Sequence, residues 1–358
     1  MIGISVYLGN GLISDQAPYI RKMKECGFQS IFTSLHIPED DHSIYRKQLY
    51  DLGLLAKELE MELMADISPA SLQTLGYDWS NAERLLDWGL TGLRIDYGVA
   101  EENIVRLSKK MKIALNASTI TPKLIDELKQ KGLVVENVEA WHNYYPRPET
   151  GLGWTDFQNR NSWLKDEGVA IMAFIPGDHT LRGPLYNTLP TLEAHRNASP
   201  FSSFLELKNR GKVEKIIIGD IEISTDSLKQ FQAYREGEIL LRAEPVKLKD
   251  KSIIQKVAGV HTNRSDNARD CIRSVESRHY ASIGKESIKP ENCIERPRGT
   301  ITIDNENYRR YQGELQITLS NLPADEKVNV IGRVIEDDLR VLQWVSGDQK
   351  FRIQWMEG

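Results

Sequence analysis

Short apolar runs alternate with amphipathic segments over the first two thirds of the chain. Eight runs have the length and side-chain content of buried strands. Amphipathic patterns such as 17–26, 45–60, 82–88 and 122–131 lie between them and close on a glycine or a charged residue, as helix C-termini do. Eight strand–helix units in roughly 235 residues predict an α/β fold, a (β/α)8 (TIM) barrel. The expected strands are Ile2–Leu8, Ser30–Leu35, Leu63–Ile67, Gly92–Ile95, Ile113–Asn116, Val134–Trp141, Ala170–Ile175 and Lys215–Gly219.

An open, doubly wound sheet is the rival architecture. It calls for a glycine-rich phosphate turn, spaced G-x-G-x-x-G, after an early strand. The nearest segment, Tyr7-Leu8-Gly9-Asn10-Gly11, lacks that spacing, so the barrel is favoured.

The sequence changes character near Glu236-Gly237, where helical periodicity fades. Alternating β-branched residues then predict strands at 238–248, 299–304, 314–319 and 328–334, and Ser346-Gly347-Asp348 predicts a hairpin. A helix is predicted around Asn267–Ser277. We expect a TIM-barrel domain at 1–236 and a smaller, mostly-β barrel domain at 237–358.

The composition of the chain argues against nucleic acid and membranes as binding partners. Lys and Arg number 46 and Asp and Glu 51, a net charge of −5, so neither a basic nucleic-acid surface nor an acidic tail stands out. No stretch approaches the ~20 apolar residues that cross a bilayer, and the N-terminus lacks the charged start of a signal peptide. Three cysteines without C-x-x-C spacing fit a reducing compartment. We expect a cytoplasmic protein that binds neither nucleic acid nor membrane.

Polar residues follow most of the predicted strands, where a barrel of this kind places its active site. Carboxylates facing one another across a barrel mouth suit glycoside hydrolysis. An Asp after a strand is also a common helix cap. Capping explains Asp66 and Asp96 poorly, because Ser68 is the better cap for a helix at Pro69 and Asp96 precedes its helix by several residues. These two are the leading acids, and Asp178, Asp220 and Glu222 are alternates. The other polar residues of this set are Tyr7, Asn10, His36, Asn116, Ser118, Glu139, His142 and Asn143.

Two loops carry further candidate binding residues. The segment Trp141–Gly151 offers His142, Asn143 and Tyr144 to a sugar and Arg147 to an anion, although it is also interpretable as a proline-stiffened structural loop. The segment 177–196 adds Arg182, His195 and Arg196 after the seventh strand, where barrels often bind phosphate. The three arginines together favour an anionic substrate, although each alone fits a surface ion pair.

Other chemistries are less well supplied. A Schiff-base lysine belongs near a strand C-terminus, but Lys112 and Lys215 fall at strand beginnings. The histidines show no H-x-H or H-E-x-x-H pattern, and no G-x-S-x-G is present. We therefore expect no metal and no cofactor.

Several longer strings resemble one known family. They are His142–Gly151, Arg182–Leu185, Leu189–Arg196, Asn263–Asp266 and Arg298–Asn305. Together, over essentially the whole chain, they are similar to the MupG family of bacterial 6-phospho-N-acetylmuramidases. The resemblance implies a cytoplasmic glycosidase of cell-wall (peptidoglycan) recycling, with a TIM-barrel domain followed by a cyclophilin-like β-domain. It implies as substrate a phosphorylated amino-sugar disaccharide, N-acetylmuramic acid 6-phosphate β-1,4-linked to N-acetylglucosamine.

These observations lead to one main hypothesis and two alternatives. One of Asp66 and Asp96 protonates the leaving oxygen and the other attacks the anomeric carbon or activates water, with retention and inversion both open. Arg264 either closes over the barrel mouth or belongs to a solvated helix start. The alternatives are a phosphosugar-binding protein without catalysis and a phosphosugar isomerase or epimerase.

Overall fold

The computed structural model describes residues 1–356 except 10, 36–43, 96–97, 250–251 and 280–286. The chain divides into two compact units, Met1–Thr225 and Asp226–Gly358, which are described separately. The domain boundary expected after residue 236 lies at the far end of helix α8 (Thr225–Arg235) and stays a prediction. In the described residues, no helix has both the length and the hydropathy needed to cross a bilayer.

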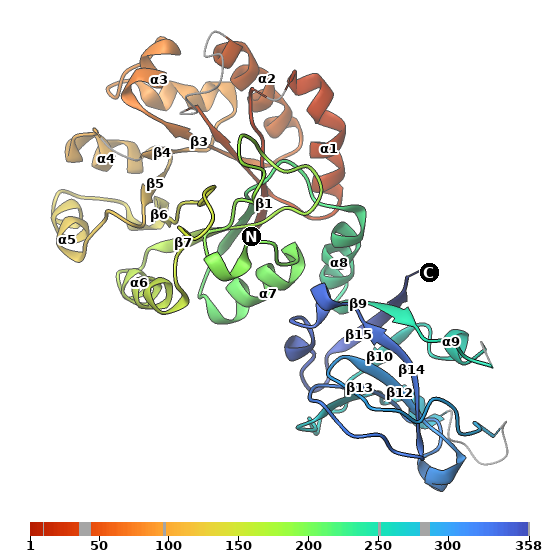
Figure 1. The fold of residues 1–358 in the computed structure, drawn as a ribbon. Coiled ribbons are helices and arrows are strands. Elements are labelled where there is room, and N and C mark those ends of the chain that lie inside the picture. The colour runs from red at the N-terminus through yellow and green to blue at the C-terminus, as the bar shows by residue number, and fades with distance from the viewer. Residues whose placement is uncertain (10, 36–43, 96–97, 250–251, 280–286, 357–358) are drawn as a thin grey trace. The chain divides into compact units, whose positions relative to one another are not determined.

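Eight parallel strands close into a barrel in the first unit, so the predicted (β/α)8 fold is confirmed (Figure 1). Each strand pairs with the next in sequence, and β8 pairs with β1 to close the ring. The strands are β1 Ile2–Ser5, β2 Ser30–Ser34, β3 Glu62–Ile67, β4 Gly92–Ile95, β5 Lys112–Asn116, β6 Val138–Trp141, β7 Ala170–Ile175 and β8 Lys215–Ile218.

Helices α1 to α7 surround these strands (Figure 1). Three of them begin with the same signature, a Ser or Thr followed by Pro, in which the hydroxyl accepts a backbone N–H of the first turn: Ser68, Thr121 and Ser199. The expected helix at 82–88 is instead a 3₁₀-helix, η2 (Ala82–Trp88). The α-helices are α1 Ile13–Glu25, α2 Tyr45–Glu58, α3 Pro69–Thr74, α4 Glu101–Ser108, α5 Pro122–Gln130, α6 Trp154–Asp166 and α7 Pro200–Arg210, and two short 3₁₀ turns are η3 Val135–Asn137 and η4 Glu193–His195.

Inward-facing positions recur at every second strand residue and stack in three layers, because successive residues of a strand face opposite sides. The lower layer, at the strand N-termini, is charged. The middle layer is apolar and aromatic, and the upper layer is polar. The lower layer contains Ser30, Glu62, Lys112, Glu139 and Lys215, the middle layer Phe32, Met64, Ala114, Trp141 and Ile217, and the upper layer Ser34, Asp66, Arg94 and Asn116.

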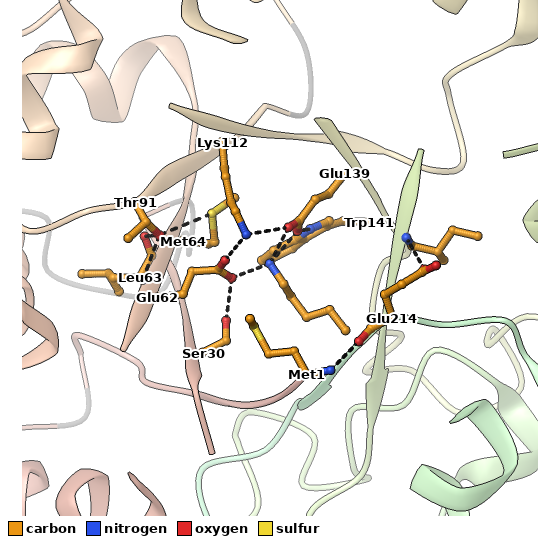
Figure 2. Close-up of polar contacts among 12 residues, drawn as sticks. Met1, Ser30, Glu62, Leu63, Met64, Thr91, Lys112, Glu139, Trp141 and Glu214 are labelled. Atoms are coloured by element: carbon orange, nitrogen blue, oxygen red, sulfur yellow. Dashed lines mark hydrogen bonds and ion pairs between the residues drawn. The ribbon is translucent and has the colours of Figure 1, made fainter. Parts of the chain in front are cut away.

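The lower layer holds two glutamates and two lysines, of which the side chains of Glu62, Glu139 and Lys215 are buried and that of Lys112 is 36% exposed. Lys215 Nζ lies 2.6 Å from Glu139 Oε2 and also contacts Glu62, and Lys112 Nζ lies 2.5 Å from Glu62 Oε2. In Figure 2, Glu62, Lys112 and Glu139 point toward one another. Burial by itself raises the pKa of Glu62, but the two ammonium groups outweigh it and hold the pKa below its usual value. The opposite charges offset the cost of burying them.

The second unit is a mostly antiparallel sheet of seven strands in the order β10-β15-β9-β14-β12-β13-β11. The bridge between Asn263 and Ser274 joins its two edges, so the sheet is a nearly closed barrel, as predicted. Its bounds are β9 Glu238–Pro245, β10 Val260–Thr262, β11 Cys271–Arg273, β12 Thr300–Asp304, β13 Leu315–Thr318, β14 Val328–Val334 and β15 Lys350–Trp355, with short helices α9 Ser252–Lys256, η5 Glu276–His279, η6 Glu306–Tyr311, η7 Glu336–Asp338 and η8 Leu342–Trp344.

Two local predictions in this unit are wrong. The segment Asn267–Ser277 is not a helix, because β11 passes through it and pairs with β13. Ser346-Gly347-Asp348 is not a hairpin turn, because the chain before it forms η8 and the strand after it pairs with β9 and β10. In both places pairing between distant strands overrides the local pattern.

Replacing Lys215 with Met removes one buried cation and leaves Glu62 and Glu139 with less compensating charge. We expect the free energy of unfolding to fall by about 3 kcal/mol, as for other broken buried ion pairs. Chemical denaturation of the full chain, followed by tryptophan fluorescence, measures this. Lys123→Met is the matched control, since Lys123 is 85% exposed and, among the described residues, pairs only with Glu127 one helical turn away, and it should change stability little. Equal stability of the two variants would contradict this role of the cluster.

Candidate active site

Three polar side chains meet in the upper layer, at the C-terminal ends of β2, β3 and β4. The strand register aligns Asp66 with Ser34 on one side and with Arg94 on the other. Arg94 Nη1 donates to Asp66 Oδ1 over 2.8 Å, and Ser34 Oγ donates to Asp66 Oδ2 over 3.3 Å. The side chains of Arg94 and Asp66 are 8% and 15% exposed. Asp66 is therefore a carboxylate in a largely buried ion pair that still reaches solvent.

Asn143 joins this group from the segment after β6. Arg94 Nη2 donates to Asn143 Oδ1 over 2.5 Å, and the backbone oxygen of Asn143 accepts from Thr191 Oγ1 over 2.8 Å. Asn143 is two residues beyond Trp141, which faces the barrel interior. The guanidinium of Arg94 thus connects the third and fourth strands to the loop after the sixth.

Arg182 lies against two tyrosine rings that follow β1 and β6. Its Cζ is 4.5 Å from the centroid of the Tyr7 ring and 5.8 Å from that of Tyr144, and its Nη1 donates to the Tyr144 hydroxyl over 3.0 Å. Burial raises the pKa of both phenols, so they stay neutral at physiological pH. A guanidinium stacked on aromatic rings at the barrel mouth is suited to bind an anionic group.

Asp220 holds the loop that carries Arg182. This carboxylate is fully buried; Oδ2 accepts the backbone N–H of Gly177 over 2.8 Å and of Leu189 over 3.0 Å, and Oδ1 accepts that of Arg182 over 3.1 Å. Burial raises the pKa of Asp220, although the three N–H donors oppose that shift. A carboxylate enclosed by backbone donors acts here as a positioning group.

The other two candidate arginines differ in their surroundings. Arg196 is nearly buried and pairs with Glu193 over 2.6 Å, and it also donates to the backbone oxygens of Tyr145 and Asn187. It braces the loops after β6 and β7 against each other. Arg147 is exposed. Of the three arginines, Arg182 is the one held over the barrel mouth by aromatic rings.

The candidate histidines His142 and His195 face helices rather than the upper layer. His142 Nε2 lies 2.7 Å from Asn161 Oδ1 on α6, and burial lowers the pKa of His142 to about 4, so the ring is neutral. His195 is buried as well, with Nε2 3.1 Å from Glu206 Oε2 on α7. Both rings position loops against helices.

The remaining described candidates form local contacts. Asn116 Oδ1 accepts the backbone N–H of the exposed Ser118 over 2.9 Å. Asp178 accepts the backbone N–H of Ser224 over 2.7 Å, and Glu222 accepts the Thr180 hydroxyl over 2.5 Å. These last two contacts tie the loop after β7 to the turn after β8.

Several expectations fall elsewhere. Asn10, His36 and Asp96 lie outside the described residues. Arg264 belongs to the second unit, where its Nε lies 2.7 Å from Asp266 Oδ1, and its closure of the barrel mouth stays a prediction. The placement of Glu139 at the mouth is wrong, because the side chain lies in the lower layer with Lys215.

Sequence reasoning missed Arg94. Its signal is the string Gly92-Leu93-Arg94-Ile95, in which a charged residue stands between two apolar residues of a buried strand. Such a residue faces the barrel interior at the same level as the polar residue of the neighbouring strand, here Asp66.

Asp220→Asn replaces one acceptor oxygen with an amide that cannot accept the backbone N–H groups. We expect amide hydrogen exchange across 177–189 to accelerate by about 10–100-fold, which corresponds to losing one hydrogen bond to a charged acceptor. Hydrogen-exchange mass spectrometry checks this. Asp178→Asn is the control, because it alters the contact with Ser224 and should leave the amides of Arg182 and Leu189 protected. Unchanged exchange in Asp220→Asn would remove the positioning role.

Comparisons with known proteins find matches over nearly the whole chain. The family model described as 6-phospho-N-acetylmuramidase, N-terminal, matches residues 2–233, and the corresponding C-terminal model matches residues 238–354. A conserved Enterococcus faecalis protein of unknown function has a crystal structure with 44% sequence identity and a TM-score of 0.90, over 99% of this chain and 96% of that chain. An uncharacterized B. cereus protein shares 25% identity with a TM-score of 0.76, over 99% of both chains. No curated protein matches. With both of its parts matched by the family models, the chain belongs to the MupG family of 6-phospho-N-acetylmuramidases.

Proposed function

We propose that the protein is a cytoplasmic glycosidase that cleaves the β-1,4 bond between N-acetylmuramic acid 6-phosphate and N-acetylglucosamine. The observation that carries the proposal is the group at the barrel mouth, in a chain of this family. There the carboxylate of Asp66 is paired with Arg94, and Arg182 contacts Tyr7 and Tyr144. A glycosidase needs a carboxylate beside the anomeric carbon, and a phosphorylated substrate needs a cation within reach.

In this proposal Asp66 is one of two acid–base groups. Glycoside hydrolysis combines a group that protonates the leaving oxygen with a carboxylate that attacks the anomeric carbon or activates water. Asp96, two residues after Arg94 in sequence, is our candidate for the second group. The upper layer surrounds Asp66 with hydrogen-bond donors, and the aromatic middle layer beneath it excludes water from below.

The proposed anion contact is Arg182. Tyr7 and Tyr144 limit the positions that its side chain can adopt, and Asp220 fixes its backbone N–H. The substrate offers two anionic groups, the 6-phosphate and the lactyl carboxylate. We assign Arg182 to the phosphate, because its loop follows the seventh strand, where barrels often bind phosphate.

Asp66→Asn keeps the size of the side chain but removes its negative charge. With the phosphorylated disaccharide as substrate, we expect turnover to fall by about 10²–10⁴-fold, as for the loss of a catalytic acid–base group. Release of N-acetylglucosamine, measured by liquid chromatography and mass spectrometry, checks this. Asp126→Asn, which changes an exposed carboxylate on α5, should keep most of the activity. Binding of the disaccharide without cleavage by the unaltered protein would support a phosphosugar-binding protein instead.

Arg182→Met removes the proposed phosphate contact. We expect KM for the phosphorylated disaccharide to rise by about 10–100-fold, the equivalent of one or more charge-assisted hydrogen bonds, with a smaller effect on the unphosphorylated disaccharide. Steady-state kinetics with both substrates measures the difference. Arg147→Met is the matched control at an exposed arginine and should change KM little. An equal rise in KM for both substrates would show that Arg182 does not bind the phosphate.

A further inference from the structure

The surroundings of Asp66 indicate how the two acid–base roles are divided, an inference that rests on the proposed function. We propose that Arg94 is a positioning residue that keeps Asp66 ionised and oriented, so that Asp66 is the nucleophile or base and a different group is the acid.

The first argument is the hydrogen bonding of the carboxylate itself. One oxygen of Asp66 accepts from the guanidinium of Arg94 and the other accepts from the hydroxyl of Ser34. A protonated carboxyl group would give up the attraction of the adjacent guanidinium, and its O–H would compete with one of these two donors for the same space. The site is therefore built to accept hydrogen bonds at Asp66.

The second argument is that Arg94 is held in place. Its side chain is 8% exposed, one nitrogen of its planar fork donates to Asp66, and another donates to Asn143. The N–H donors of a guanidinium lie in one plane with fixed directions. It therefore orients a partner carboxylate more precisely than an ammonium group does. Arg182 differs from Arg94, because its guanidinium contacts the rings of Tyr7 and Tyr144, and it is the group proposed to bind the substrate anion.

The third argument is the balance of charge around the pair. The described groups hydrogen-bonded to Asp66 are Ser34 from β2 and Arg94 from β4. Tyr144, from the loop after β6, interacts electrostatically with Asp66, Arg94 and Arg182. Tyr144 is neutral, and the charged neighbours of Asp66 among these residues are cations. The ion pair with Arg94 is an attraction that a protonated Asp66 would lose.

This division of roles sets the proton balance of the reaction. The bond between the anomeric carbon and the leaving oxygen breaks, and that oxygen takes a proton from the second group. The anomeric carbon bonds either to an oxygen of Asp66 or to a water oxygen whose proton passes to Asp66. In the first route a water molecule then cleaves the bond to Asp66, and its proton passes to the second group, which had lost its own in the first step. In both routes Asp66 enters the reaction without a proton.

Titration of Asp66 tests the electrostatic part independently of activity. Its carboxyl ¹³C signal, assigned by its loss in Asp66→Asn, is followed against pH in the full chain. In Arg94→Gln we expect the midpoint to rise by about one pH unit or more, and in Arg94→Lys by less than half as much. Ser34→Ala, which removes the longer, neutral donor, should shift it less than Arg94→Gln does. An unmoved midpoint in Arg94→Gln would overturn the proposal.

Kinetics tests the positioning part. We expect Arg94→Gln to lower kcat by about 10²-fold with little change in KM, and its acidic limb of kcat/KM to move upward with the titration of Asp66. Arg94→Lys should recover about tenfold of that loss and return the limb toward its original pH. In a merely structural role, kcat would fall in both variants in step with their thermal stability, and the acidic limb of kcat/KM would not move. That result would overturn the proposal.

Two further outcomes are also decisive. If Arg94→Gln does not fold, Arg94→Lys decides alone: a kcat about tenfold lower at unchanged thermal stability supports the proposal, and an unchanged kcat, or a loss that follows thermal stability, overturns it. If the unaltered protein binds the disaccharide without cleaving it, the proposed function fails. In that case the ¹³C titration still decides whether Arg94 keeps Asp66 ionised.

Discussion

The barrel depends on one geometric constraint, the alternation of inward and outward side chains along eight strands that close on themselves. Inward positions two residues apart stack along the barrel axis, so one strand contributes residues to successive layers. Charges placed in such an interior must compensate one another. Glu62 and Glu139 are matched by Lys112 and Lys215, and this cluster occupies the end of the barrel opposite the proposed active site.

The layers are physically connected. Trp141 Nε1 donates to Glu139 Oε2 over 2.7 Å in the lower layer, while the ring of Trp141 packs 5.7 Å from Phe32 in the middle layer. Phe32 and Phe174 in turn lie 6.4 Å and 5.1 Å from the ring of Tyr144, which contacts Arg182. A continuous column of packed groups thus runs from the buried ions to the barrel mouth. It separates the polar upper layer from the charged lower layer by apolar and aromatic side chains.

Four arginines near the mouth show how surroundings assign different roles to one side chain. Arg94 is paired with a carboxylate in the barrel, and Arg182 lies against two phenol rings. Arg196 is enclosed by loop carbonyl groups and Glu193, and Arg147 is exposed. Asp66 and Asp220 differ in the same way. Asp66 pairs with a cation and reaches solvent, whereas Asp220 is fully buried among backbone N–H groups.

The sequence by itself determined the features that depend on near neighbours. Apolar runs and amphipathic segments predicted the eight-stranded barrel, Ser68 before Pro69 predicted a helix cap, and strand ends predicted Asp66, Asn143 and Tyr144 at the mouth. Contacts between distant residues decided the rest. The ion pair of Arg94 joins residues 28 positions apart, and its bond to Asn143 spans 49 positions. The register between strands and the path of the loops determine such contacts, and a local sequence pattern does not predict them. The same reason explains two wrong predictions. Glu139 lies in the lower layer because it pairs with Lys215, and a strand replaces the helix expected around 267–277 because β11 pairs with β13.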